Sequence, residues 1–317
     1  PAEDRQFLRA GARRTWRYFG DFVDEQTSGL PPDNFQGAYR DQLALRTSPT
    51  NIGLYMVSVI SAHNFGYLTV DEVIYKLTQT METIDKLERY EGHLLNWYDI
   101  QTLAPLKPQY VSTVDSGNLL GALWALDQWL KTLMQVPLLD VKGFAGLRDT
   151  GEVLRQVSRE EQVSGLDVQS LDELLCTWKS PPDLITDTLG LLRQVEDRVR
   201  SLFTKTHGSA AVQGSVVYWA SQIQNQLAAL LSIADRYLSW ITILAEKTEE
   251  DIAELDPDAL PFFRRALRRA PSLLSLAGGH IPCIASLRSI KEKAPVDEFA
   301  LRGWIDRVLE AFEKSKW

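Results

Sequence analysis

The stretch RTSPTNIGLYMVSVISAHNFGYLT, residues 46–69, carries the strongest structural signal in this 317-residue chain. Ser48 followed by Pro49 is typical of a helix start, because a serine hydroxyl caps free N–H groups and proline suits the first helical position. The residues that follow are apolar almost all round, which predicts a helix buried on most of its sides. We therefore expect a central helix from Pro49 onward, with the neighbouring elements packed around it.

Amphipathic helices are predicted on both sides of this stretch. Residues 7–22 place apolar side chains at spacings of three and four, and residues 69–72 form a capping box that opens another helix. A further helix is expected where Ser112 and Asp115 have the same capping spacing, and its Trp124 and Trp129 are expected in the core. Strand signals are nearly absent, so the predicted fold class is all-α.

The rest of the chain is leucine-rich and helical. Two stretches with four-three apolar spacing, 188–202 and 216–244, are predicted to fold back as an antiparallel hairpin through the glycine-containing residues 206–215. Two or three shorter helices follow them. The expected organisation has three parts, residues 1–135, an inserted hairpin lobe at 136–255 and a helical tail at 256–317.

Charge and motif content narrow the function. Lysine and arginine number 34 against 42 acidic residues, a net charge of -8 without a basic cluster, which argues against nucleic acid or acidic membranes as partners. Cys176 and Cys283 lie far apart and the four histidines lack helical metal-pair spacing, so we expect no disulfide framework, metal or cofactor. Glycine motifs for nucleotides are missing, and no uncharged apolar run reaches the roughly 18 residues of a membrane span.

Three polar clusters depart from the helical pattern, at residues 31–36, at 46–51 and at 96–99 with 112–116. Together they offer carboxylates, amides, an arginine and aromatic rings. Proteins bind sugars with this mixture, because rings stack on C–H faces while polar groups bond to hydroxyls. Structural alternatives stay open, since residues 33–34 also fit an Asx turn and Asp115 also fits helix initiation.

Residues 46–69, with LERYEGHLLNWYDIQTLAPLKPQYVSTVDSGNLLGAL at 87–123, resemble the middle, glucoamylase-like region of bacterial cyclic β-1,2-glucan synthases. The likeness covers residues 13–130, and the hairpin resembles an insertion that these synthases carry. The resemblance implies an (α/α)6-barrel, of which this chain would hold an incomplete part with an inserted antiparallel helical hairpin. It also implies that the domain binds linear β-1,2-glucan and closes it into a ring by transglycosylation.

On this resemblance, two carboxylates are expected to hold substrate or to assist the reaction, Asp115 and Asp99. The subsites are expected to be shaped by Asp33, Asn34, Arg46, Asn96, Trp97 and Tyr98. A retaining transglycosylase needs two carboxyl groups roughly 5–5.5 Å apart. The family's catalytic glutamate is expected to lie beyond this chain, so the piece is expected to be incomplete for catalysis on its own.

Two alternatives remain beside the glucan hypothesis. The chain could be a non-catalytic helical scaffold that packs between domains of a multidomain glycan synthase, or an incomplete barrel that dimerises over an exposed apolar seam. The expected partners are β-1,2-glucan and the other domains of the parent synthase. The parent is expected in the bacterial inner membrane, with this piece on the cytoplasmic side and without a span of its own.

Overall fold

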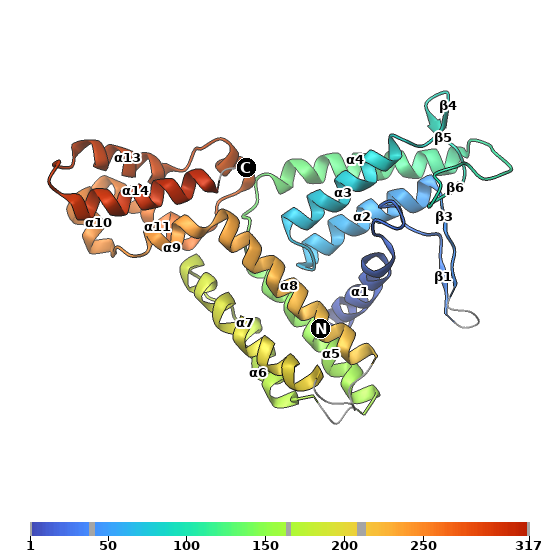
Figure 1. Ribbon diagram of the computed structural model, residues 1–317, viewed down its shortest axis with the longest axis horizontal. Coiled ribbons are helices and arrows are strands. Elements are labelled where there is room, and N and C mark those ends of the chain that lie inside the picture. Colours follow the sequence, from blue (N-terminus) through green and yellow to red (C-terminus); the bar gives the residue numbers. More distant parts are fainter. Residues whose placement is uncertain (1, 38–41, 163–165, 208–213, 316–317) are drawn as a thin grey trace. The chain divides into compact units, whose positions relative to one another are not determined.

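Helices dominate the protein, which confirms the all-α prediction (Figure 1). The computed structural model describes residues 2–37, 42–162, 166–207 and 214–315. The chain folds into two compact units, residues 1–131 and 132–317. The expected barrel arrangement and the expected boundaries at 135 and 255 remain predictions.

The first unit is built around α2 (Pro49–Phe65), with α1 (Ala2–Phe22), α3 (Val70–Ile84) and α4 (Thr113–Leu133) around it. The start of α2 is capped as predicted, because Ser48 Oγ accepts the N–H of Asn51 at 3.2 Å. Its residues Ile52, Met56 and Val59 are fully buried. At the start of α3, the N–H and hydroxyl of Thr69 both donate to the Glu72 carboxylate, at 2.7 and 2.8 Å. The predicted caps therefore fix where both helices begin.

Short two-stranded ribbons, which were not predicted, connect the helices of the first unit. β1 (Phe35–Gln36) pairs with β2 (Gln42–Leu43), β3 (Arg46–Thr47) with β6 (Tyr98–Asp99), and β4 (Arg89–Tyr90) with β5 (His93–Leu94), all antiparallel. Strands of two residues are too short to show an alternation in the sequence. The β3–β6 ribbon joins two of the predicted polar clusters, with Arg46 opposite Asp99.

The segment that leads into the first ribbon is fastened to α3. Thr80 Oγ1 donates to the Gly29 carbonyl at 2.9 Å, and Thr83 Oγ1 donates to the Ser28 carbonyl at 2.7 Å. Gly29 has a φ of +69°, and a Cβ there would lie 3.1 Å from the Cβ of Gln79. Glycine is therefore needed at this position both for its conformation and for the close approach.

Apolar side chains of α4 are exposed. The prediction that Trp124 is a core residue is therefore wrong. Its side chain is 69% exposed, and Leu120, one turn earlier on the same side, is 50% exposed. Trp129 is partly buried, and its indole N–H donates to Asn64 Oδ1 at 3.2 Å. The sequence shows that these residues are apolar, but it does not show which element covers them.

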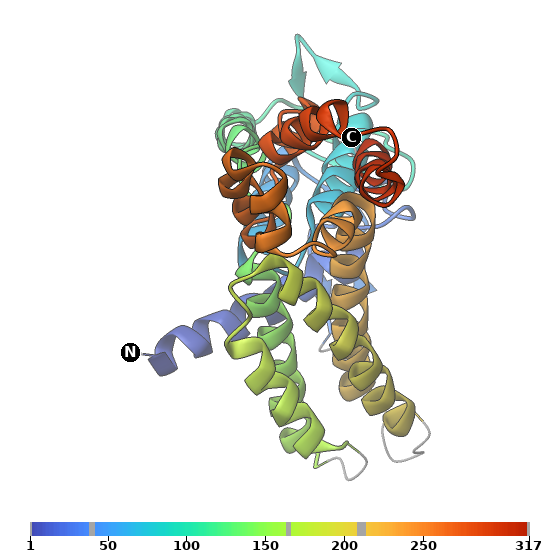
Figure 2. The same ribbon diagram turned by 90° about the vertical axis from the view of Figure 1, so that its left-hand side faces the viewer.

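The second unit consists of an α-helical array. Its elements are α5 (Val141–Glu160), α6 (Val168–Lys179), α7 (Ile185–His207), α8 (Ser215–Tyr237), α9 (Ser239–Leu244), α10 (Glu249–Leu255), the 3₁₀ turn η1 (Pro257–Ala259), α11 (Leu260–Arg268), α12 (Leu273–Ala277), α13 (Pro282–Lys293) and α14 (Phe299–Lys314). Figures 1 and 2 show α7 and α8 running in opposite directions, and α5 packs against α6 and α8. The helix predicted over 216–244 is interrupted at Leu238, and the predicted connection at 206–215 lies mostly outside the described residues.

The tail helices share their core with α9. The Trp240 ring meets Phe312 of α14 edge-on at 5.7 Å, and Trp304 Nε1 donates to the Ile243 carbonyl at 2.9 Å. In the part of the chain that the structure describes, the stretch Leu273–Lys293 has the length and mean hydropathy, 1.2, of a candidate membrane span. This stretch is divided between α12 and α13. The α13 residues Ile284 and Leu287 are buried.

Candidate functional site

Asp33 connects the first two predicted polar clusters. Its Oδ2 accepts from Arg46 Nη2 at 2.9 Å and Nε at 3.2 Å, and from Asn34 Nδ2 at 3.0 Å. Its Oδ1 accepts from Asn51 Nδ2 at 3.2 Å. The pKa of the nearby Tyr18 is raised mainly by burial of that side chain and to a lesser extent by the negative charge of Asp33. Because both oxygens bond within the protein, the main effect of Asp33 is to position Arg46.

The guanidinium of Arg46 lies over the ring of Trp97, with Cζ 4.6 Å from the ring centre. A cation over a tryptophan face is attracted by the ring's quadrupole. The β3–β6 ribbon creates this contact, since Arg46 lies in β3 and Trp97 immediately precedes β6. The Arg46 side chain remains 50% exposed and Trp97 is half-buried. The pair therefore presents an aromatic ring and several N–H donors at the surface.

A second group of polar side chains surrounds Asp115, near the start of α4. Thr50 Oγ1 donates to Asp115 Oδ1 at 2.5 Å, and Asn118 Nδ2 donates to Thr50 Oγ1 at 3.1 Å. The N–H of Asp115 donates to Ser112 Oγ at 3.2 Å, which is half of the predicted capping box. Among the described residues, Asp115 Oδ2 accepts no hydrogen bond. Asp115 thus both helps to start α4 and keeps one carboxylate oxygen for another donor.

The first turn of α2 links the two groups, because Thr50 bonds to Asp115 and the next residue, Asn51, bonds to Asp33. Close packing of α2 on α4 supports this link, since a Cβ at Gly53 would lie 3.0 Å from Ala122 Cβ. Sequence reasoning placed Thr50 and Asn51 in the cluster at 46–51 without naming them as site residues, and it missed Asn118. The signal that points to Thr50 and Asn51 is a pair of polar residues directly after Pro49, at the start of an apolar helix.

Two predicted subsite residues, Tyr98 and Asn96, have buried side chains that bond within the protein. The Tyr98 side chain is fully buried, where its hydroxyl donates to the Glu88 carbonyl and accepts the Leu95 N–H, both at 2.6 Å. Burial is the main cause of the raised pKa of Tyr98. Asn96 is 3% exposed, and its Oδ1 accepts the N–H of Tyr110 at 3.3 Å. Both side chains bond to the backbone of the loops around the β3–β6 ribbon.

Asp99 forms a turn immediately after the ribbon. Its Oδ1 accepts the N–H groups of Gln101 and Thr102, at 3.0 and 2.8 Å, and the Thr102 hydroxyl at 3.0 Å. The hydrogen bond from the Thr102 N–H is the largest of the causes that hold the pKa of Asp99 below its ordinary value. A carboxylate that stays ionised and is bonded into a turn is poorly suited to donate a proton. The geometry therefore gives Asp99 a structural role.

Metal-ligand side chains do not gather in the described part of the chain. No group of three or more histidine, cysteine, aspartate or glutamate side chains there is placed to hold a metal ion. Cys176 is exposed, Cys283 is buried, and both are free thiols.

Comparisons with known proteins find one family model and one curated relative. A family model described as "Protein of unknown function (DUF3131)" matches residues 10–134. A cyclic β-(1,2)-glucan synthase of Rhizobium meliloti (strain 1021) is 47% identical over 154 residues, which make up 48% of this chain and 5% of that synthase. The likeness read from the sequence motifs is thereby confirmed as similarity to part of such a synthase. The matched region is a small part of the relative's length.

Proposed function

We propose that the chain is a piece of a cyclic β-1,2-glucan synthase, and that its first unit contributes part of a surface that binds linear β-1,2-glucan. The observation that carries this proposal is the 47% identity with a named synthase over 154 residues. The family region at residues 10–134 includes both polar groups described above. The parent protein would be membrane-associated, and its remaining domains would be partners of this chain.

The chemistry of the exposed groups suits a neutral, hydroxyl-rich chain. A glucose ring offers C–H faces to an aromatic ring and hydroxyls to amides, guanidinium groups and carboxylates. Trp97 with Arg46 supplies the first kind of contact, while Asn118 and the open oxygen of Asp115 supply the second. In the parent enzyme, Asp115 would hold a sugar hydroxyl or assist transglycosylation, with the second carboxyl group supplied by residues outside this chain.

The test is calorimetric titration of the purified chain with linear β-1,2-glucooligosaccharides. We expect Asp115→Asn and Arg46→Gln each to weaken binding by about tenfold or more, because each removes a charged hydrogen-bonding partner. Asp127→Asn is the matched control, since Asp127 lies three turns further along α4 and pairs with Lys131 at 2.7 Å. A folded chain that binds no oligosaccharide would refute the proposal, as would equal affinity of all three variants.

Product analysis of the same samples separates binding from catalysis. We expect no cyclic product from this chain alone, since the reaction needs a second carboxyl group near Asp115 and the predicted partner Asp99 is bonded into its turn. Formation of cyclic glucan would contradict this part of the proposal and would show that the chain holds a complete catalytic set.

The exposed apolar side chains of α4 favour a second candidate function, packing against another part of the parent synthase. Leu120 and Trp124 are exposed side by side, and exposed apolar patches commonly mark interaction sites. This scaffold function predicts that Trp124→Gln weakens association with the remaining domains of the synthase and leaves oligosaccharide affinity unchanged. Pull-down of those domains by the wild-type and variant chains measures the difference.

A further inference from the structure

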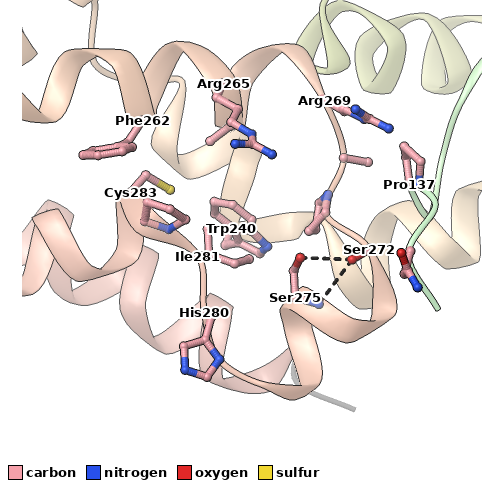
Figure 3. Close-up of a pocket in the computed structure, with 15 residues that line it drawn as sticks. Pro137, Trp240, Phe262, Arg265, Arg269, Ser272, Ser275, His280, Ile281 and Cys283 are labelled. Atoms are coloured by element: carbon pink, nitrogen blue, oxygen red, sulfur yellow. Dashed lines mark hydrogen bonds between the residues drawn. The ribbon is translucent and has the colours of Figure 1, made fainter.

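A cavity of about 330 Å³ is formed by residues of the second unit (Figure 3). Its wall comes from α9, α11, α12, the start of α13 and the connections between them. In Figure 3, Phe262, Arg265 and Arg269 lie along one side, Ser275 and His280 lie on the opposite side, and Trp240 lies between them. A volume of this size is at the lower end of the range of ligand pockets, about 300–1,000 Å³.

The charged side chains of the cavity are all basic. Arg265 and Arg269 are one helical turn apart, as the bond from the Arg269 N–H to the Arg265 carbonyl shows. Neither guanidinium has an ion-pair partner among the described residues, whereas the adjacent Arg264 pairs with Glu249. The lining contains no aspartate or glutamate. In a chain with a net charge of -8, two unpaired like charges at one cavity mark a place where an anion would be stabilised.

Two serine hydroxyls and the ring of His280 supply further polar atoms at the cavity. Ser272 Oγ accepts the Ser275 N–H at 3.2 Å and shares a hydrogen bond with Ser275 Oγ at 3.0 Å, so one of the two hydroxyl protons remains for a ligand. The ring of His280 lies against Gly278, where a Cβ would come within 2.6 Å of Nδ1. The chain reaches this ring through a fixed turn, in which the His280 N–H donates to the Ser275 carbonyl at 3.2 Å.

The remaining wall is apolar and uncharged. Trp240 and Ile281 are buried, while Phe262 is 42% exposed at the cavity. The indole N–H of Trp240 is already bonded to the Tyr237 carbonyl at 3.1 Å, so the ring contributes only apolar surface. Burial raises the pKa of the Cys283 thiol to about 12, which keeps this group neutral. The cavity therefore combines two basic side chains with aromatic and aliphatic surface.

We propose that this cavity is a binding site for a small organic phosphate, whose phosphate group is held by Arg265 and Arg269 and whose organic part rests on Phe262 and Trp240. Guanidinium groups bind phosphate oxygens through paired, charge-assisted hydrogen bonds. The Ser272–Ser275 pair and His280 supply further donors on the opposite side. The site is separate from the proposed glucan surface, so either proposal can fail without the other.

The experiment is calorimetric titration of the full chain with phenyl phosphate and with inorganic pyrophosphate. We expect saturable binding that weakens as salt is added, and a loss of about tenfold or more in Arg265→Gln and in Arg269→Gln. Arg268→Gln is the matched control, because Arg268 lies in the same segment but outside this cavity, and it should bind like the wild type. Phe262→Ala should weaken phenyl phosphate more than pyrophosphate.

Two outcomes would overturn the proposal. One is a folded chain that binds neither of the two phosphate compounds nor phosphatidic acid vesicles, which would show that the two arginines hold no phosphate. The other is binding that Arg268→Gln weakens as much as the cavity variants do. A parallel arm with phosphatidic acid vesicles and phosphatidylcholine vesicles identifies the source. Binding to the former alone, lost in the cavity variants, would assign the phosphate to a lipid headgroup, whereas binding of phenyl phosphate assigns it to a soluble molecule.

Discussion

Replacing Gly53 by alanine should destabilise the first unit, although alanine favours helices. A methyl group at this position would lie 3.0 Å from Ala122 Cβ and 3.4 Å from the Leu119 Cα. Neither atom is the end of a flexible side chain, so α2 and α4 must move apart to make room. Gly121→Ala is the matched control, because this glycine is exposed on α4 and a methyl group there meets nothing within 4 Å.

The expected magnitudes follow from two opposing effects. Forcing an extra carbon into a packed interface costs about 1–3 kcal/mol, and exchanging glycine for alanine inside a helix gains about 1 kcal/mol. Gly53→Ala should therefore lower the free energy of unfolding by about 1 kcal/mol. Gly121→Ala has only the favourable helix effect and should raise the free energy of unfolding by about 0.5–1 kcal/mol. The opposite signs at two helical glycines are the distinctive part of this prediction.

Hydrogen exchange of the α2 backbone amides measures the effect in the first unit alone. A change of 1 kcal/mol corresponds to about a fivefold change in protection, lower in Gly53→Ala and higher in Gly121→Ala. Oligosaccharide affinity should fall only in the first variant, since moving α4 separates Thr50 from Asp115. The reasoning is refuted if Gly53→Ala protects α2 as well as Gly121→Ala does.

Three further substitutions test the supports and the core. Tyr98→Phe leaves the buried Leu95 N–H unpaired and should cost about 1–3 kcal/mol, measured by urea unfolding and by faster exchange of that amide, whereas Tyr110→Phe at an exposed site should not. The Thr102 amide in the turn held by ionised Asp99 should be protected from hydrogen exchange above the ordinary pKa of a carboxyl group, and this protection should be lost as the pH falls through the lowered pKa. In Asp99→Asn, the protection of this amide should no longer depend on pH. A pH-dependent protection that persists in the variant would contradict the assignment. Trp178→Ala should lower the free energy of unfolding by about 3–5 kcal/mol, measured by thermal or urea unfolding, because that side chain is 1% exposed. Trp124→Ala should lower it by less than about 0.5 kcal/mol. Equal losses would show that Trp124 is a core residue.

Local signals made much of the helical fold predictable. The Ser48 cap and the Thr69–Glu72 box depend on neighbours in sequence, and both form as expected. The exposure of Trp124 could not be predicted in this way, because it depends on which element packs against α4. The break at Leu238 was also missed, since the apolar spacing continues through it.

The candidate site was predictable in composition but not in role. Asp33 bonds to Arg46, and Arg46 lies over the ring of Trp97. Tyr98 and Asn96 stand beside them in sequence, yet the ribbon turns their side chains into the protein. A two-residue strand reverses the direction of each successive side chain, so the outward position could be known only after the β3–β6 pairing was known.

The β3–β6 ribbon also makes any ligand contact with Arg46 and Trp97 depend on the folding of the first unit. It closes a loop of about 50 residues that contains α2 and α3, and the entropy of closing such a loop favours pairing after these helices have packed. The contact between Arg46 and Trp97 then exists in the complete first unit and not in its separated segments. An oligosaccharide that needs this contact binds the native state selectively and raises its stability with ligand concentration. Under the proposed function, glucan would thus favour completion of this unit.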